Sequence, residues 1–156
     1  MLVKKQITIF IVEDNKTFAL ALKIDIERAF VNMNIKILLF ETGETCIEKF
    51  KWENPQVVIL DYHLNNKYPD AIDGIKVLDW IIKEKSEAFV IMLTHEDDIN
   101  IAIKSFQHGA SDYVVKSDSQ FRKITFSLLN FVKIMRAKSD AAKYKRELQK
   151  YKENTL

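Results

Sequence analysis

Charged and hydroxyl side chains follow four of the five apolar runs in this sequence, at the point where each run ends. Glu13 and Asp14 follow the first run, Asp61 the third, Thr94 the fourth and Lys116 the fifth. Three carboxylates in one crevice would repel one another unless a cation neutralised them. Oxygen ligands favour magnesium, manganese or calcium over zinc or copper, and magnesium commonly combines carboxylates with phosphate oxygens. With a lysine and a hydroxyl nearby, these groups suit phosphoryl transfer to a nucleophilic carboxylate.

Each of these residues also has an ordinary structural explanation when it is taken alone. A single aspartate after a strand commonly caps a helix or belongs to a turn, and Asp14 could cap the first helix. A single threonine or lysine at a strand end is commonly a surface residue. It is the shared position of the five residues, directly after four apolar runs, that favours one common site.

The hydrophobic pattern predicts the elements that position these residues. Five runs rich in β-branched residues are typical of strands buried on both faces of a parallel sheet. They are Ile7–Val12, Ile35–Phe40, Val57–Leu60, Phe89–Leu93 and Tyr113–Val115. Helix-period segments follow each run, with Thr42 and Asp73 as expected N-caps and Gly109 as an expected helix stop. In the fourth of these segments, helical spacing predicts one apolar face of Ile99, Ala102, Ile103 and Phe106.

The resulting order of elements predicts an α/β fold. A (βα)5 chain forms a doubly wound, flavodoxin-like parallel sheet with strand order 2-1-3-4-5 and helices on both faces. Ligands of such sheets bind beyond the carboxyl ends of the strands, where the strand order reverses. That point lies between the first and third strands, so Glu13, Asp14 and Asp61 are expected to converge there.

Length and composition limit the other possibilities. The chain has 156 residues, which suits one domain. The single cysteine, Cys46, excludes an internal disulfide and a multi-cysteine zinc site. No apolar run approaches the roughly 18 residues that cross a bilayer. Residues 1–6, MLVKKQ, do not have the layout of a signal peptide. We therefore expect a cytoplasmic protein without a membrane partner.

The end of the sequence differs from the rest in charge. Residues 136–156 carry a net charge of +4, whereas the preceding residues carry −2. We expect a domain at residues 1–135 and a basic helical C-terminal extension at 136–156 that continues the fifth helix. Heptad spacing in this extension is consistent with a homodimeric coiled coil or with a solvated helix. The positions with this spacing are Ile134, Ala137, Ala141, Tyr144, Leu148 and Tyr151.

Four segments together resemble a known family. IFIVEDN, VVILDYHL, VIMLTHE and GASDYVVKS are similar, in order and spacing, to the signatures of receiver domains of two-component response regulators, including those of the chemotaxis-regulator type. The resemblance covers roughly residues 7–135. It implies that Asp61 is the phosphoacceptor, and that Glu13, Asp14, Asp61 and the backbone carbonyl of His63 bind Mg²⁺.

The same resemblance implies the remaining site roles and the partners. Thr94 and Lys116 would contact the phosphoryl group, and Thr94 and Tyr113 would couple phosphorylation to a partner-binding face. The phosphodonor would be a sensor histidine kinase or a phosphotransfer protein, and the output a downstream protein target without direct DNA binding. The chain would then be a phosphoacceptor signalling domain and not an enzyme. A receiver-like scaffold that binds partners without phosphorylation is the alternative.

The sequence departs from the family pattern in three places. Ser117 follows Lys116 where the family commonly has proline, which excludes a cis X-Pro bond there. The loop between Asp61 and Gly74 is several residues longer than usual, and its segment Asn65–Asp73 could shield the site, contact a partner or do neither. His63 and Glu96 occupy the two positions with which the family tunes phosphate lifetime.

Overall fold

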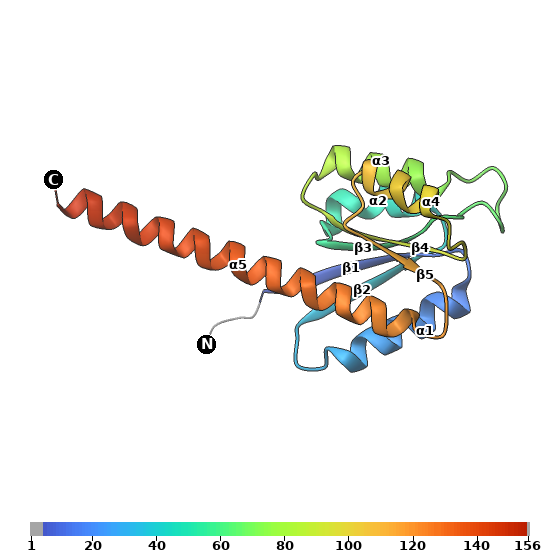
Figure 1. Cartoon of the computed structure of the whole chain (residues 1–156), viewed down its shortest axis with the longest axis horizontal. Helices are drawn as coiled ribbons and strands as arrows, with labels where there is room; N and C mark the ends of the chain where they lie inside the picture. Colours follow the sequence, from blue (N-terminus) through green and yellow to red (C-terminus); the bar gives the residue numbers. More distant parts are fainter. Residues whose placement is uncertain (1–4, 156) are drawn as a thin grey trace. The chain divides into compact units, whose positions relative to one another are not determined.

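The computed structural model describes residues 5–155. Within them, one parallel sheet has the order β2-β1-β3-β4-β5, and a helix follows each strand (Figure 1). The strands are β1 (Ile7–Val12), β2 (Ile35–Phe40), β3 (Val57–Asp61), β4 (Phe89–Thr94) and β5 (Asp112–Val115). The helices are α1 (Lys16–Ala29), α2 (Gly43–Glu53), α3 (Gly74–Glu84), α4 (Ile99–Gln107) and α5 (Gln120–Asn154). The predicted doubly wound fold, its strand order and its long C-terminal helix are confirmed.

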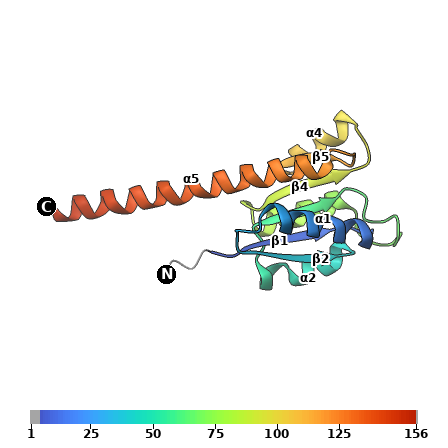
Figure 2. The same cartoon turned by 90° about the horizontal axis from the view of Figure 1, so that it is seen from below.

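The core explains why the strands read as continuous apolar runs. Helix α1 covers one face of the sheet, and α2, α3 and α4 lie on the other (Figures 1 and 2). Side chains of the central strands are therefore enclosed from both sides, and all five residues of β3 are buried. On the face of α2 and α3, Phe50 packs edge-on against both Phe10 and Trp80, with ring centroids 6.1 and 5.4 Å apart. A packed core of this kind holds the strand ends rigidly.

Local capping fixes where the helices begin and end. The side chains of Thr42 and Asp73 accept hydrogen bonds from backbone N–H groups of the first turns of α2 and α3, as predicted. Gly109, with φ +103°, follows the end of α4, also as predicted. The alternative that Asp14 caps the first helix is wrong, because Asn15 is the N-cap of α1 and accepts from the N–H of Phe18 at 3.0 Å. Asp14 is thereby left to face the end of the sheet.

Helix α4 has the apolar periodicity that the sequence predicts, but this face does not enter the core. Ile99, Ile103 and Phe106 are 73, 48 and 49% exposed. The buried residue of α4 is instead Ser105, whose hydroxyl donates to the carbonyl oxygen of Ile101 at 2.8 Å. The periodicity therefore identified a helix correctly without determining which side of it packs.

The chain divides into two compact units between Thr125 and Phe126, inside α5. The first unit contains the whole sheet and α1 to α4, and the second contains the part of α5 from Phe126 to Asn154. The expected domain boundary between residues 135 and 136 stays a prediction, because α5 is continuous through both positions. None of the helices within residues 5–155 combines the length and the apolar character needed to cross a bilayer.

Candidate functional site

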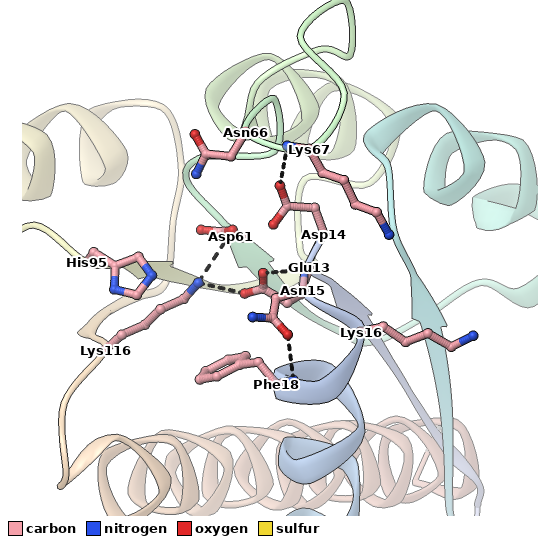
Figure 3. A pocket seen from close by; sticks show the side chains of 10 residues that line it. All are labelled: Glu13, Asp14, Asn15, Lys16, Phe18, Asp61, Asn66, Lys67, His95 and Lys116. Carbon is pink, nitrogen blue, oxygen red and sulfur yellow. Dashed lines mark hydrogen bonds and ion pairs between the residues drawn. The ribbon is translucent and has the colours of Figure 1, made fainter.

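The carboxyl ends of four parallel strands deliver the polar residues predicted from the sequence. Asp61 and Thr94 are the last residues of β3 and β4, and Glu13 and Lys116 directly follow β1 and β5. In the register of β1 and β3, Val12 lies beside Leu60, so the next residue along each strand brings two carboxylates together. Glu13, Asp14, Asp61 and Lys116 line one pocket of about 540 Å³, whereas Thr94 is not among its lining residues (Figure 3).

The three acidic residues form a compact and buried cluster. Glu13, Asp14 and Asp61 each offer an oxygen, and these atoms lie within 4.8 Å of one another. Burial, followed by repulsion from Asp61, raises the pKa of Glu13 from 4.5 to about 7. Burial is also the main reason why the pKa of Asp61 is raised. Such shifts are expected where negative charges are held together out of water.

Lys116 is the buried counter-charge. Its ammonium donates to Oε2 of Glu13 at 2.7 Å and lies 3.4 Å from Oδ2 of Asp61, while its side chain is 6% exposed. The ring of Phe18, with its centroid 4.8 Å from the ammonium, adds a cation–π contact. One ammonium cannot balance three carboxylates, so the ionised cluster keeps two excess negative charges. A hard divalent cation matches both this excess and the all-oxygen donor set.

Backbone amides fix the orientation of each carboxylate. The N–H of Asn15 donates to Oε1 of Glu13 at 3.0 Å, and that of His63 donates to Oδ1 of Asp61 at 3.2 Å. Asp14 receives its hydrogen bond from the N–H of Lys67, at 3.2 Å from Oδ2. These bonds aim the remaining lone pairs into the pocket and partly offset the cost of burial. The role of the His63 carbonyl as a metal ligand stays a prediction.

The long loop after β3 contributes to this site. Asn66 and Lys67 line the pocket, and Lys67 provides the N–H that holds Asp14 (Figure 3). The loop is tied to Glu41, after β2, by the ammonium of Lys67 at 3.4 Å and the hydroxyl of Tyr68 at 3.2 Å. Its far end needs glycine, because a Cβ on Gly74 would overlap the carbonyl oxygen of Asp61. The extra length of the loop was visible in the sequence, but this contact was not.

The predicted coupling residues lie on β4 and β5 and meet at one backbone segment. Thr94, which is fully buried, accepts the N–H of Glu96 on its hydroxyl at 3.1 Å. The hydroxyl of Tyr113 donates to the carbonyl oxygen of Glu96 at 2.7 Å. The carboxylate of Glu96 also contacts the ring of His63 at 3.0 Å. Glu96 therefore connects the end of β4 to β5 and to the residue that holds Asp61, which sequence reasoning did not predict.

Known proteins share both the sequence pattern and this fold. The family model described as the response regulator receiver domain matches residues 9–125, most of the chain. This chain belongs to that family. As a receiver domain, it has the fold of the family together with an acidic pocket whose residues Glu13, Asp14 and Asp61 fit a phosphoacceptor site.

Individual relatives of this receiver domain are distant in sequence. It is 26% identical over 107 residues to the DNA-binding transcriptional regulator NtrC of Klebsiella pneumoniae, covering 69% of this chain and 21% of NtrC. It is also 26% identical over 108 residues to the regulatory protein PhoP of Bacillus subtilis, covering 69% of this chain and 41% of PhoP. The chain spans less than half the length of these curated relatives.

A solved structure agrees with the assignment. The BeF3-activated receiver domain of DrrB, a Thermotoga maritima protein, superposes with a TM-score of 0.67 at 27% identity. The match covers 83% of this chain and 99% of that chain. The fold, and not only the short motifs, is therefore shared with receiver domains.

Proposed function

We propose that this receiver domain accepts one phosphoryl group on Asp61, supplied by a sensor histidine kinase or a phosphotransfer protein. The observation that carries the proposal is the position of Asp61 at the end of a fully buried central strand, inside the acidic pocket. One of its oxygens is held by the N–H of His63, and the other lies 3.4 Å from the ammonium of Lys116. In this role the chain is a phosphoacceptor and not an enzyme that acts on a separate substrate.

The proposed transfer requires little covalent chemistry from the protein. An oxygen of Asp61 forms a bond to phosphorus while the bond from phosphorus to the donor histidine nitrogen breaks, and the imidazole leaves with the electron pair of that bond. It leaves as neutral imidazole if its other nitrogen carries a proton, and otherwise it takes one proton from water as it leaves. Lys116 lies close enough to Asp61 to contact an oxygen of the transferred group. Alignment and charge stabilisation then account for most of the rate, as is general for phosphoryl transfer.

The acidic cluster fits Mg²⁺ by its donor atoms and by its excess charge. Glu13, Asp14 and Asp61, with the backbone carbonyl of His63, would hold the ion. When bound, the cation offsets negative charge on the phosphoryl oxygens and on the cluster. Asp61 is the acceptor in this proposal because it ends the fully buried central strand β3, and its Oδ2 lies 3.4 Å from the ammonium of Lys116, which could then contact the transferred group.

We further propose that Thr94 and Tyr113 transmit phosphorylation to a face that binds a downstream protein, without direct DNA binding. The connection through Glu96 supports this route, because a shift of the Thr94 hydroxyl toward a phosphoryl group would release the N–H of Glu96. The Thr94→Ala variant should still accept phosphate but show smaller NMR shift changes around Tyr113 on beryllofluoride binding. Shift changes equal to those of the wild type would exclude this route.

Intact-mass analysis tests the central proposal. Incubation with acetyl phosphate or phosphoramidate and Mg²⁺ should add one phosphoryl mass to the wild type and none to Asp61→Asn. Asp118→Asn is the matched control, because it removes an exposed carboxylate and should be labelled like the wild type. Equal labelling of Asp61→Asn, or no labelling of the wild type with any phosphodonor or kinase, would favour a scaffold that binds partners without phosphorylation.

A further inference from the structure

The C-terminal part of α5 carries an apolar stripe that is open to solvent. Heptad positions a and d, counted from Ile134, are occupied only by apolar or aromatic residues through Tyr151. Ile134, Tyr144, Leu148 and Tyr151 are 44, 76, 56 and 68% exposed, and the two alanines of the stripe are exposed as well. The stripe is formed by Ile134, Ala137, Ala141, Tyr144, Leu148 and Tyr151.

The limits of the stripe are clear in the sequence. One heptad earlier, the a and d positions are Ser127 and Asn130, which are polar. The apolar repeat therefore starts at Ile134 and extends over three heptads, to Asn154 at the end of α5. Position a recurs every seven residues, which is slightly less than two full turns of an α-helix. The stripe therefore winds around the helix in a left-handed sense, as the seam of a coiled coil does.

Charges beside the stripe indicate what covers it. The e positions are Lys138, Lys145 and Lys152, while two of the g positions are Asp140 and Glu147. In a parallel, in-register pair of helices, each g residue faces the e residue of the following heptad on the other helix. Asp140 would then face Lys145 of a second copy, and Glu147 would face Lys152 of that copy.

Other arrangements fit these charges less well. In an antiparallel pair the e positions face one another, so lysines would oppose lysines along that side. In the parallel pair, the unfavourable contact is confined to Lys133 and Lys138 at the start of the seam. The stripe also has alanine at two of its six core positions, which suits the narrow core of two helices better than the wider core of three.

We propose that residues 134–154 bind the same segment of a second copy of this chain as a parallel, in-register, two-stranded coiled coil. Three heptads with two alanine layers make a short seam, so the pair should form at high protein concentration and dissociate on dilution. The proposal rests on α5 alone and is independent of phosphorylation at Asp61.

Cross-linking of the full-length chain tests the direction and register of the helices. Ala137→Cys places a thiol at a d position, where two parallel helices bring their Cβ atoms close enough for a disulfide. Ala142→Cys, at an outward b position of the same helix, is the matched control. The native Cys46 is fully buried, and burial raises the pKa of its thiol to about 12, so it should not form a disulfide under these conditions. Under mild oxidation, dimer should accumulate with Ala137→Cys and not with Ala142→Cys.

Inverting the charges at the e and g positions tests whether the same segment of a second copy is the partner. The Asp140→Lys/Glu147→Lys double variant carries lysines at all four positions of the two g–e pairs, 140/145 and 147/152, and Lys145→Glu/Lys152→Glu carries acids at all four. Each variant alone should sediment as a monomer of about 18.3 kDa, the mass of one chain. An equimolar mixture should restore a dimer, and adding salt should weaken it.

Several outcomes would overturn the proposal. A wild-type chain that stays monomeric at every concentration would end it, as would a trimer. Equal cross-linking at residues 137 and 142 would show that the contact is not this seam. Charge-exchanged variants that dimerise alone as well as in the mixture would show that another surface holds the copies together.

Discussion

The same charged residue types have very different surroundings in the acidic pocket and in the second half of α5. In the pocket, Lys116 is 6% exposed and lies within 3.4 Å of two buried carboxylates. In α5, Lys145, Asp140 and Glu147 are exposed to solvent. A charge pair near 4 Å interacts several times more strongly in a protein interior than in water, and an unpaired charge costs far more there.

The difference shows how one kind of residue can serve two purposes. Buried charges need partners at fixed positions, so they form a rigid site with shifted pKa values. Exposed charges contribute little stability each, but they select which second helix fits beside their own. Substitutions of charged residues in the pocket should therefore change the free energy of unfolding much more than substitutions of exposed charged residues.

Removal of the pocket lysine should have the largest effect on stability. In metal-free protein above pH 7, Lys116→Met should lower the free energy of unfolding by about 3–5 kcal/mol, since it leaves buried carboxylates without a counter-charge. Lys145→Met, which removes an exposed lysine, should change it by less than about 0.5 kcal/mol. Urea unfolding of dilute protein measures both. Similar losses for the two variants would contradict the contrast between the regions.

The pH dependence of stability should follow from Glu13. The pKa of Glu13 is about 7 in the folded chain, whereas an unperturbed glutamate, as in the unfolded chain, has a pKa of 4.5. The folded state therefore binds the proton more tightly than the unfolded state does. The contribution of Glu13 to stability is therefore most favourable below pH 4.5 and declines as pH rises toward 7, by on the order of 3 kcal/mol. Asp61, whose pKa is also raised, acts in the same direction.

The measurement compares wild type with Glu13→Gln in metal-free buffer. Titration of other groups is shared by the two proteins, so the difference in unfolding free energy isolates Glu13. The stability of the wild type relative to Glu13→Gln should fall between pH 4.5 and 7 and stay level above that range. A difference that is independent of pH would show that Glu13 ionises normally in the folded chain.

Magnesium binding should restore much of the stability that is lost when the buried carboxylates ionise. At 100 times its dissociation constant, a ligand of the folded state adds about 2.7 kcal/mol of stability. The gain should increase with pH, because the cation competes with the proton on Glu13. Asp14→Ala should abolish both the gain and the NMR shift changes around the pocket, whereas Asp118→Ala should keep them. An undiminished response in Asp14→Ala would place the ion elsewhere.

An exposed ion pair should have the smallest effect. Lys23 and Glu27 on α1 are 3.1 Å apart, with side chains 32 and 49% exposed. Lys23→Ala should change the free energy of unfolding by less than about 0.5 kcal/mol, because such pairs are solvated and screened by salt. Thermal unfolding at low and high salt gives the value. A loss as large as that of Lys116→Met would invalidate the distinction between buried and exposed pairs.

The sequence by itself determined the strands, their order and the residues at their ends. Short apolar runs rich in β-branched residues are typical of strands in a parallel sheet, and the strand limits were predicted from them to within one residue. Because parallel strands end at one edge of the sheet, Glu13, Asp14, Asp61 and Lys116 could be assigned to one site from the sequence, and all four line the pocket. Thr42, Asp73 and Gly109 were equally predictable, because capping depends on neighbours within a few residues.

Only the tertiary structure decided how these residues contact one another. The bond between Lys116 and Glu13 joins positions 103 residues apart, and the loop bond from Lys67 to Asp14 joins positions 53 apart. Periodicity could not show that the apolar face of α4 is exposed, since it reports a spacing and not a neighbour. Hydrogen bonds, burial and pKa shifts depend on atoms that the fold brings together from distant parts of the chain, and local sequence does not encode those distances.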